Sequence, residues 1–300
     1  MNSGQIKSLA TSLCLCGCAL DDVPAEKAGL DQPPGAEAPA EVSVIGRLDT
    51  SRISESSGVV LSRKFPGVFW THNDGGGRNR QQLFAITRQG KILADFSVQG
   101  VRLRDWEDIA IDDQRHLFVG DIGNNDAKRL QLAVYQIDEP DPKSSGPVVQ
   151  VKRQWHLLFP KAPFDCESLF VFNGYGYVIS KVFKDKKAEL YRFPLTEQKE
   201  PAVLQFVSRL RIDSPVTGAD LSPDGKLMAV VSKGGASVWK IDGVFDKLSK
   251  MKPFSTRFRH EHIEACCFVP EGLLATAESG EIFLFTNEAF RCEPIMKQVP

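Results

Sequence analysis

The chain has 300 residues and a formal net charge of −1, and it is 42% hydrophobic and 25% charged. This is a globular composition, long enough for one large all-β domain or two smaller domains. It lacks the basic surplus of a nucleic-acid-binding protein and any apolar run of about 18 residues, so we expect neither a nucleic-acid partner nor a membrane-spanning helix.

The N-terminal stretch "MNSGQIKSLATSLCLCGCALDD" has the pattern of a bacterial lipoprotein signal. Lys7 precedes a short apolar run, and "LCGC" places Cys18 as the lipidated residue. A single Lys and the unusual Cys16 leave two alternatives, a secretory signal cut near Ala19 or no signal. We expect residues 1–18 to be a leader and the Pro- and Ala-rich residues 19–41 to be a disordered tether. The leader and tether predict a protein of the bacterial cell envelope, periplasmic or extracellular, that is attached to the membrane only through its lipid. We expect it to be a monomer.

Three later cysteines, Cys166, Cys266 and Cys267, fall in apparent strands, and Cys292 lies near the C-terminus. No CxxC motif or histidine spacing indicates a zinc site. A buried cysteine in a strand acts as a small hydrophobic residue. An export compartment would permit a disulfide, and the sequence does not determine which cysteines would pair.

The same hairpin pattern occurs five times along the chain. Each copy is an apolar strand, a tight turn and a second apolar strand. The five copies are "ESSGVVLSRKFPGVFWTHND", "EDIAIDDQRHLFVGD", "ESLFVFNGYGYVISK", "TGADLSPDGKLMAVVSK" and "EACCFVPEGLLATAE".

A third strand follows every hairpin, and a fourth segment follows the first four. "VSVIGRL" (residues 42–48) could supply the missing strand of the fifth unit. A period of roughly 50 residues with four strands predicts a β-propeller closed by both ends of the chain. We predict five blades over residues 42–290 and a tail at 291–300. Six blades remain an alternative if two short ones are merged, and a β-sandwich is the competing fold.

In a propeller, the starts of the first strands and the ends of the second strands meet at one mouth of the central channel. Aligning the repeats on their first acid predicts an inner ring of Glu55, Glu107, Glu167, Thr217 and Glu264. The matching ends of the second strands are Asp74, Asp121, Lys181, Lys233 and Glu278.

Four carboxylates close to one axis repel one another, so either some are protonated or a cation neutralises them. Oxygen ligands from several blades favour Ca²⁺, whose coordination is more adaptable than that of Mg²⁺. The inner ring is therefore a predicted Ca²⁺ site. The alternative is that these acids hold neighbouring blades together.

Polar loops that differ between blades surround the predicted mouth. Arg78, Lys181 and Lys233 place positive charge beside the acids. A phosphorylated or other anionic small molecule, bound through a bridging cation, would suit this mixture. Asp74, Arg78, Asp121, Lys181, Lys233 and Glu278 are the predicted ligand-binding residues.

The set "NDGGG", "DWEDIA", "GDIGNN" and "VTGADLSPDGK" resembles exported bacterial propellers of the phytase-like or esterase-like group. One glutamate per blade is also similar to the five-bladed calcium-activated nucleotidases, which hold a central Ca²⁺. That resemblance implies Glu55, Glu107, Glu167 and Glu264 as Ca²⁺ ligands. No Ser-His-Asp arrangement supports an esterase.

Two functions follow from these patterns. The first is a metal-dependent phosphoester hydrolase, in which cation-bound water attacks the ester. The second is a non-catalytic scaffold that binds an envelope protein. No residue of the sequence can be assigned as a catalytic base.

Overall fold

The structure is a computed structural model, and it describes residues 41–75, 81–101, 104–144, 147–183, 187–212 and 215–290. All of these residues belong to one compact unit. Several predicted features lie outside the described residues: the leader with Cys18, the tether up to residue 40, Arg78, Cys292 and the C-terminal tail. No helix in the described part is long and apolar enough to cross a membrane.

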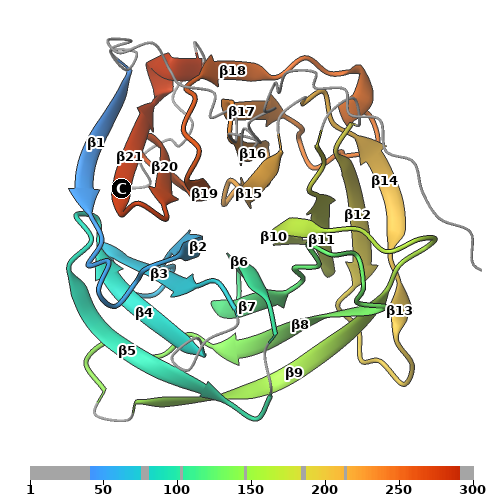
Figure 1. The fold of residues 1–300 in the computed structure, drawn as a ribbon, viewed down its shortest axis with the longest axis horizontal. Helices are drawn as coiled ribbons and strands as arrows, with labels where there is room; N and C mark the ends of the chain where they lie inside the picture. Colours follow the sequence, from blue (N-terminus) through green and yellow to red (C-terminus); the bar gives the residue numbers. More distant parts are fainter. Residues whose placement is uncertain are drawn as a thin grey trace, which may run out of the picture. The chain divides into compact units, whose positions relative to one another are not determined.

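Strand pairing gives five four-stranded antiparallel blades. They are arranged in a ring around a central axis (Figure 1). In chain order the first four blades are β2(Ser56–Leu61), β3(Val68–Asn73), β4(Gln82–Thr87), β5(Ile92–Gln99); β6(Trp106–Ile111), β7(His116–Asp121), β8(Gln131–Asp138), β9(Val148–Leu158); β10(Cys166–Phe172), β11(Tyr175–Ser180), β12(Glu189–Pro194), β14(Gln205–Arg209); and β15(Val216–Leu221), β16(Leu227–Ser232), β17(Gly235–Lys240), β18(Phe254–Arg257).

The fifth blade joins the two ends of the chain. Its strands are β19(Ile263–Val269), β20(Gly272–Ala277) and β21(Glu281–Thr286), with β1(Val42–Arg47) paired antiparallel to β21. The five innermost strands contact one another in a closed ring, with β19 next to β2. The predicted five-bladed propeller is therefore confirmed, together with its closure by the N-terminal strand.

The outer rim differs from a set of independent blades. β5 and β9 pair in parallel, so the first two blades form one continuous sheet. The fourth segment of blade three is divided, and its first part, β13(Ala202–Val203), pairs with β9 of the preceding blade. Two 3-10 turns, η1(Leu248–Lys250) and η2(Asn287–Phe290), are the helical segments among the described residues.

The core consists of separate apolar clusters between adjacent blades. Trp70 and Trp106 lie in the cluster between blades one and two, Trp155 between two and three, and Trp239 between three and four. All four tryptophans are fully buried. Burying the two faces of every blade in this way holds the innermost strands in place around the channel.

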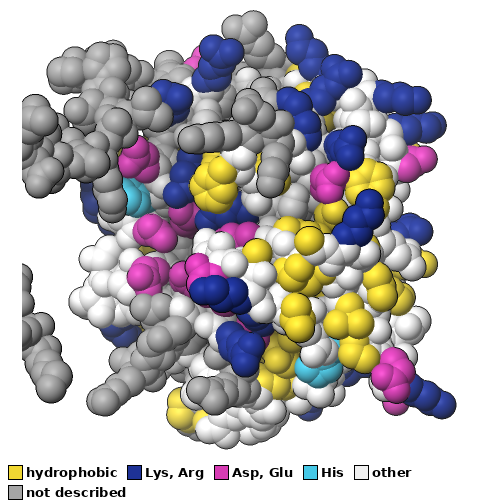
Figure 2. All heavy atoms as spheres, turned by 45° about the vertical axis from the view of Figure 1, so that its right-hand side comes forward, with side chains coloured by type: hydrophobic (Ala, Val, Ile, Leu, Met, Phe, Trp, Pro, Cys, Tyr) yellow, Lys and Arg dark blue, Asp and Glu magenta, His cyan; other side chains and the backbone are white. Residues whose placement is uncertain are grey.

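The three cysteines expected in strands are buried there and free, Cys166 in β10 and Cys266 and Cys267 in β19. Hydrophobic side chains also gather on the surface that carries β12 and β14 (Figure 2). Phe206 of β14 is 53% exposed, and Tyr191, packed edge-to-face against it, stacks on Phe164.

Candidate functional site

Each innermost strand has a β-bulge immediately after its first residue. The pairing register with the second strand shifts there in all five blades. A bulge adds one residue to a strand and changes where its side chain points. All five bulged residues are buried at the same mouth of the channel, and we call them the bulge ring: Ser57, Glu107, Glu167, Thr217 and Glu264.

The alignment of Glu55 with the other glutamates is wrong. Glu55 precedes β2, and the bulged residue of blade one is Ser57. The backbone oxygen of Glu55 accepts the N–H of Asp74, as that of Asp165 accepts the N–H of Lys181. Glu55 therefore occupies the position two residues before the ring. "Ser-Gly" in blade one matches "Thr-Gly" in blade four, which is the signal that the alignment on acids passed over.

Asp121 also differs in position from Lys181 and Glu278. It pairs with Trp106 inside the sheet, and one extra residue follows, so Gly123 donates its N–H to Asp105 as Lys181 does to Asp165. The Asp121 carboxylate accepts the backbone N–H of Asp105 at 2.9 Å. It also pairs with Arg129 at 3.0 Å.

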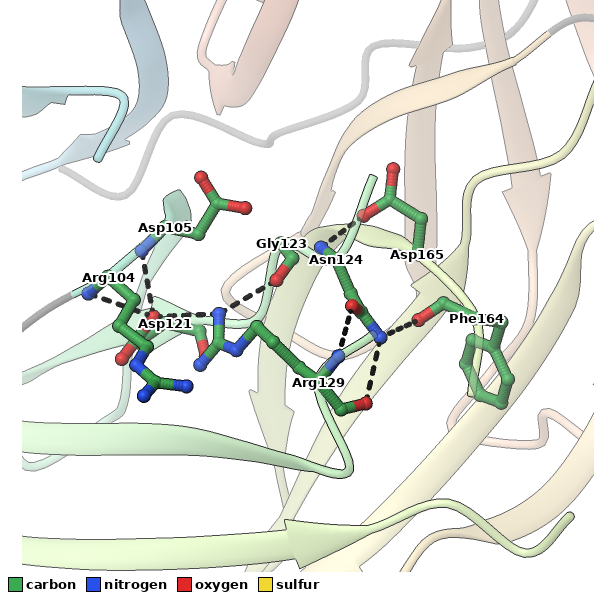
Figure 3. A network of polar contacts seen from close by, with 8 residues as sticks. All are labelled: Arg104, Asp105, Asp121, Gly123, Asn124, Arg129, Phe164 and Asp165. Atoms are coloured by element: carbon green, nitrogen blue, oxygen red, sulfur yellow. Dashed lines mark hydrogen bonds and ion pairs between the residues drawn. The ribbon is translucent and has the colours of Figure 1, made fainter. Parts of the chain in front are cut away.

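The loop "GDIGNN" (residues 120–125) connects blade two to blade three through hydrogen bonds, and we call it the bracket (Figure 3). Arg129 donates to the backbone oxygen of Gly123 at 2.7 Å. Asn124 donates its backbone N–H to Asp165 at 2.6 Å and its side-chain amide to the Phe164 backbone oxygen at 3.3 Å. The Asp121 carboxylate contacts the Asp105 backbone and Arg129. Its role is therefore to hold this loop in place at the mouth.

Three carboxylates meet beside this bracket. One oxygen from each of Asp74, Asp105 and Glu107 lies within 4.8 Å of the others. Glu107 is 3% exposed, and its Oε2 accepts from the Ser57 hydroxyl at 3.3 Å. Its Oε1 is buried and has no hydrogen-bond partner among the described residues. We call this group the acid cluster.

Gly123 leaves room for the acid cluster. A Cβ at this position would lie 2.1 Å from Glu107 Oε1 and 2.5 Å from Asp105 Oδ2. The two carboxylates therefore occupy the space that any other side chain would need.

The electrostatics of the acid cluster oppose ionisation. Burial, followed by the charges of Glu167, Asp74 and Asp105, raises the pKa of Glu107 well above its usual range. Burial also raises the pKa of Asp105, against the effect of Arg129. A bound cation would offset these penalties, because it favours the ionised form of every carboxylate around it.

The other glutamates of the bulge ring have basic partners. Glu167 pairs with Lys181 at 2.6 Å, and Glu264 pairs with Lys233 at 3.6 Å. Glu278 contacts His262 at 3.4 Å and is half-exposed. The Thr217 hydroxyl is buried without a partner among the described residues. The mouth therefore has the acid cluster in blades one and two and these glutamate–lysine pairs in blades three to five.

Asp105 and Asp165 were missed as site residues by the sequence reasoning. Both lie two residues before a ring glutamate, in "DWE" and "DCE", so the repeated Asp-x-Glu could have identified them. Gly123 carries no comparable signal.

These features define a five-bladed propeller with an acid cluster at one mouth. No protein-family model and no curated protein matches the chain. The chain is similar to the structure titled "Structure of Dos1 propeller", with a TM-score of 0.39 and 14% identity. The match covers 74% of this chain and about half, 52%, of that one. The assignment of the fold rests on the strand pairing described above.

Proposed function

We propose that the acid cluster binds one divalent cation, with Ca²⁺ preferred, and that the cation binds an anionic ligand at the mouth of the propeller. The observation that carries this proposal is the buried Glu107, whose unpartnered Oε1 lies beside the carboxylates of Asp74 and Asp105. The ligand set differs from the predicted ring of four glutamates, because Glu167 and Glu264 pair with lysines.

A cation would neutralise the acid cluster while each carboxylate stays ionised. It would also give a ligand bond to the buried Glu107 Oε1, which has no hydrogen-bond partner among the described residues. Three carboxylates supply hard oxygen ligands, which suit Ca²⁺ or Mg²⁺. Ligands contributed by two blades and their connecting loops favour the less regular geometry of Ca²⁺.

Three protein carboxylates leave coordination positions for water and a ligand, since Ca²⁺ takes six to eight oxygen atoms. Lys233 has a side chain 37% exposed and only a long contact with Glu264, so it is suited to an anion at the mouth. A phosphate ester combines the charge and oxygen atoms that such a site binds. Hydrolysis by cation-bound water is the catalytic form of the proposal, and the lipid-anchored envelope location is its cellular setting.

Isothermal titration of the chelator-treated protein with Ca²⁺ and then with Mg²⁺ tests the cation. We expect one Ca²⁺ per chain, with binding abolished in Glu107→Gln, which keeps the shape and removes the charge. Glu278→Gln is the matched control, because Glu278 is a half-exposed acid of the same mouth outside the acid cluster. Absence of divalent-cation binding, or equal loss in both variants, would refute the proposal.

The anionic ligand is tested separately with phosphate esters of small alcohols and nucleosides. Binding or release of phosphate should require Ca²⁺ and should weaken in Lys233→Gln. Cation binding without any Ca²⁺-dependent response to these esters would refute the anionic ligand and leave the cation site in place.

A further inference from the structure

A second site candidate lies at the opposite end of the innermost strands from the acid cluster. A cavity of about 340 Å³ lies there, lined mainly by blades two and three, with Arg63 of blade one and Leu221, Ser222 and Pro223 of blade four. The turns at Asp112–Gln114 and Asn173–Gly174 form part of its rim. Exposed turn residues open it to solvent, and its volume is within the range of small-ligand pockets.

One wall of the cavity belongs to blade two. Phe118, Gln136 and Arg153 are paired across β7, β8 and β9, so their side chains lie next to one another on one face of the sheet. Trp155, two residues after Arg153, lines the same cavity and lies beneath its guanidinium at 5.4 Å. Phe118 and Trp155 are buried, so they form an apolar floor.

Gln136 is a buried amide that faces this cavity with an unsatisfied group. It is 6% exposed, and its Oε1 has no hydrogen-bond partner among the described residues. A buried polar atom without a partner is costly, and native proteins usually supply one. A hydrogen-bond donor on a bound molecule would satisfy it.

Arg153 is the basic side chain of the cavity that forms no ion pair with a described residue. Its side chain makes the contact with Trp155 and no ion pair with any described residue. Two contacts involve the other ionisable side chains of the rim: Arg63 forms an ion pair with Asp113, and His116 Nδ1 lies 2.9 Å from an Asp112 carboxylate oxygen. The cavity therefore offers one free guanidinium above an apolar floor, next to the amide of Gln136.

We propose that this cavity binds a small oxyanion that carries a hydrogen-bond donor beside the charged group. The planar guanidinium of Arg153 matches the geometry of a carboxylate or a phosphate, and Gln136 accepts from the neighbouring donor. This site is separate from the acid cluster and needs no cation.

Nuclear magnetic resonance of the full chain in the presence of chelator tests this proposal. The probes are glycolate, which has a carboxylate and a hydroxyl, acetate, which lacks the donor, inorganic phosphate, and choline as a cation. Glycolate or phosphate should shift the backbone amide signals of Asn173 and Gly174, with weaker binding of acetate and none of choline. Comparing the affinities for glycolate and phosphate shows whether the cavity prefers a carboxylate or a phosphate.

Two variants test separately what the Arg153 charge and the Gln136 amide contribute to binding. Arg153→Gln should weaken oxyanion binding by about tenfold or more. Gln136→Leu should abolish the preference for glycolate over acetate while leaving the unfolding temperature unchanged or higher, because it removes an unsatisfied buried group. Arg192→Gln is the matched control: Arg192 lies 4.7 Å from the Tyr175 ring, outside the cavity.

The proposal is overturned if no oxyanion shifts the Asn173 and Gly174 signals in the millimolar range. It is also overturned if Arg153→Gln binds as tightly as the unmodified protein, or if Arg192→Gln loses binding to the same degree. Because chelator is present throughout, these outcomes do not depend on the cation proposed for the acid cluster.

Discussion

Replacing Gly123 with alanine should damage the acid cluster without unfolding the propeller. The new Cβ would lie 2.1 Å from Glu107 Oε1 and 2.5 Å from Asp105 Oδ2. Gly123 does not have the left-handed backbone conformation that alanine would resist. The collision is therefore with the carboxylate ends of two flexible side chains.

Those carboxylates must move until the Glu107 oxygen reaches ordinary contact, at 3.4 Å or more from the Cβ. A cation site tolerates changes of only about 0.2 Å in ligand distance. We expect Ca²⁺ affinity to fall by about 10–100-fold, as for changes in the residues that position metal ligands. The cation-free protein should keep its stability, because reduced freedom of the unfolded chain contributes about 0.4–1 kcal/mol in favour of folding.

Calorimetric titration with Ca²⁺ and thermal unfolding in chelator measure the two effects separately. For the unmodified protein, Ca²⁺ at a hundred times Kd adds about 2.7 kcal/mol. In a domain of this size, this raises the unfolding temperature by about 5–10 °C. Gly123→Ala should lose most of that rise. Gly75→Ala provides the contrast, because its Cβ would meet backbone atoms of Asp105 and Trp106 and should destabilise the fold itself. Unchanged Ca²⁺ affinity in Gly123→Ala would refute the reasoning.

Three further predictions concern closure, charge and the leader. Deleting residues 42–48 should lower the unfolding temperature far more than deleting residues 19–41, because only the first removes a strand paired with β21; equal stabilities would contradict this closure. Burial raises the pKa of Glu264 to about 7, despite Lys233, so in cation-free protein stability should be full below the unfolded pKa of about 4.5 and fall by about 3 kcal/mol as pH rises through 7. Glu264→Gln should flatten this decline in pH-dependent denaturation, and an unchanged decline would count against the buried carboxyl. Cys18→Ser should release the native protein from membranes or block its processing, whereas an intact Met1 on a soluble cytoplasmic protein would exclude the lipid anchor.

The sequence repeat predicted the architecture because the same packing requirement applies to every blade. Two apolar faces must be buried against neighbouring blades, so each unit needs the same alternation of strands and turns. "VSVIGRL" could be assigned to the last blade because the fifth repeat lacked a fourth strand. The pairing of β5 with β9 could not be foreseen, because backbone pairing at the rim leaves no pattern of side chains.

The sequence by itself determined that acids recur at the start of the innermost strands, and it therefore determined where on the propeller a site could form. Which acids meet was decided only by the tertiary structure. A single bulge in each blade places Ser57 in the ring in place of Glu55, and one extra residue moves Gly123 into the position expected for Asp121. Lysines pair with Glu167 and Glu264, whereas the carboxylates of Glu107, Asp105 and Asp74 lie close to one another. Register shifts of one or two residues and the partners of each charge depend on packing between blades, which no single repeat encodes.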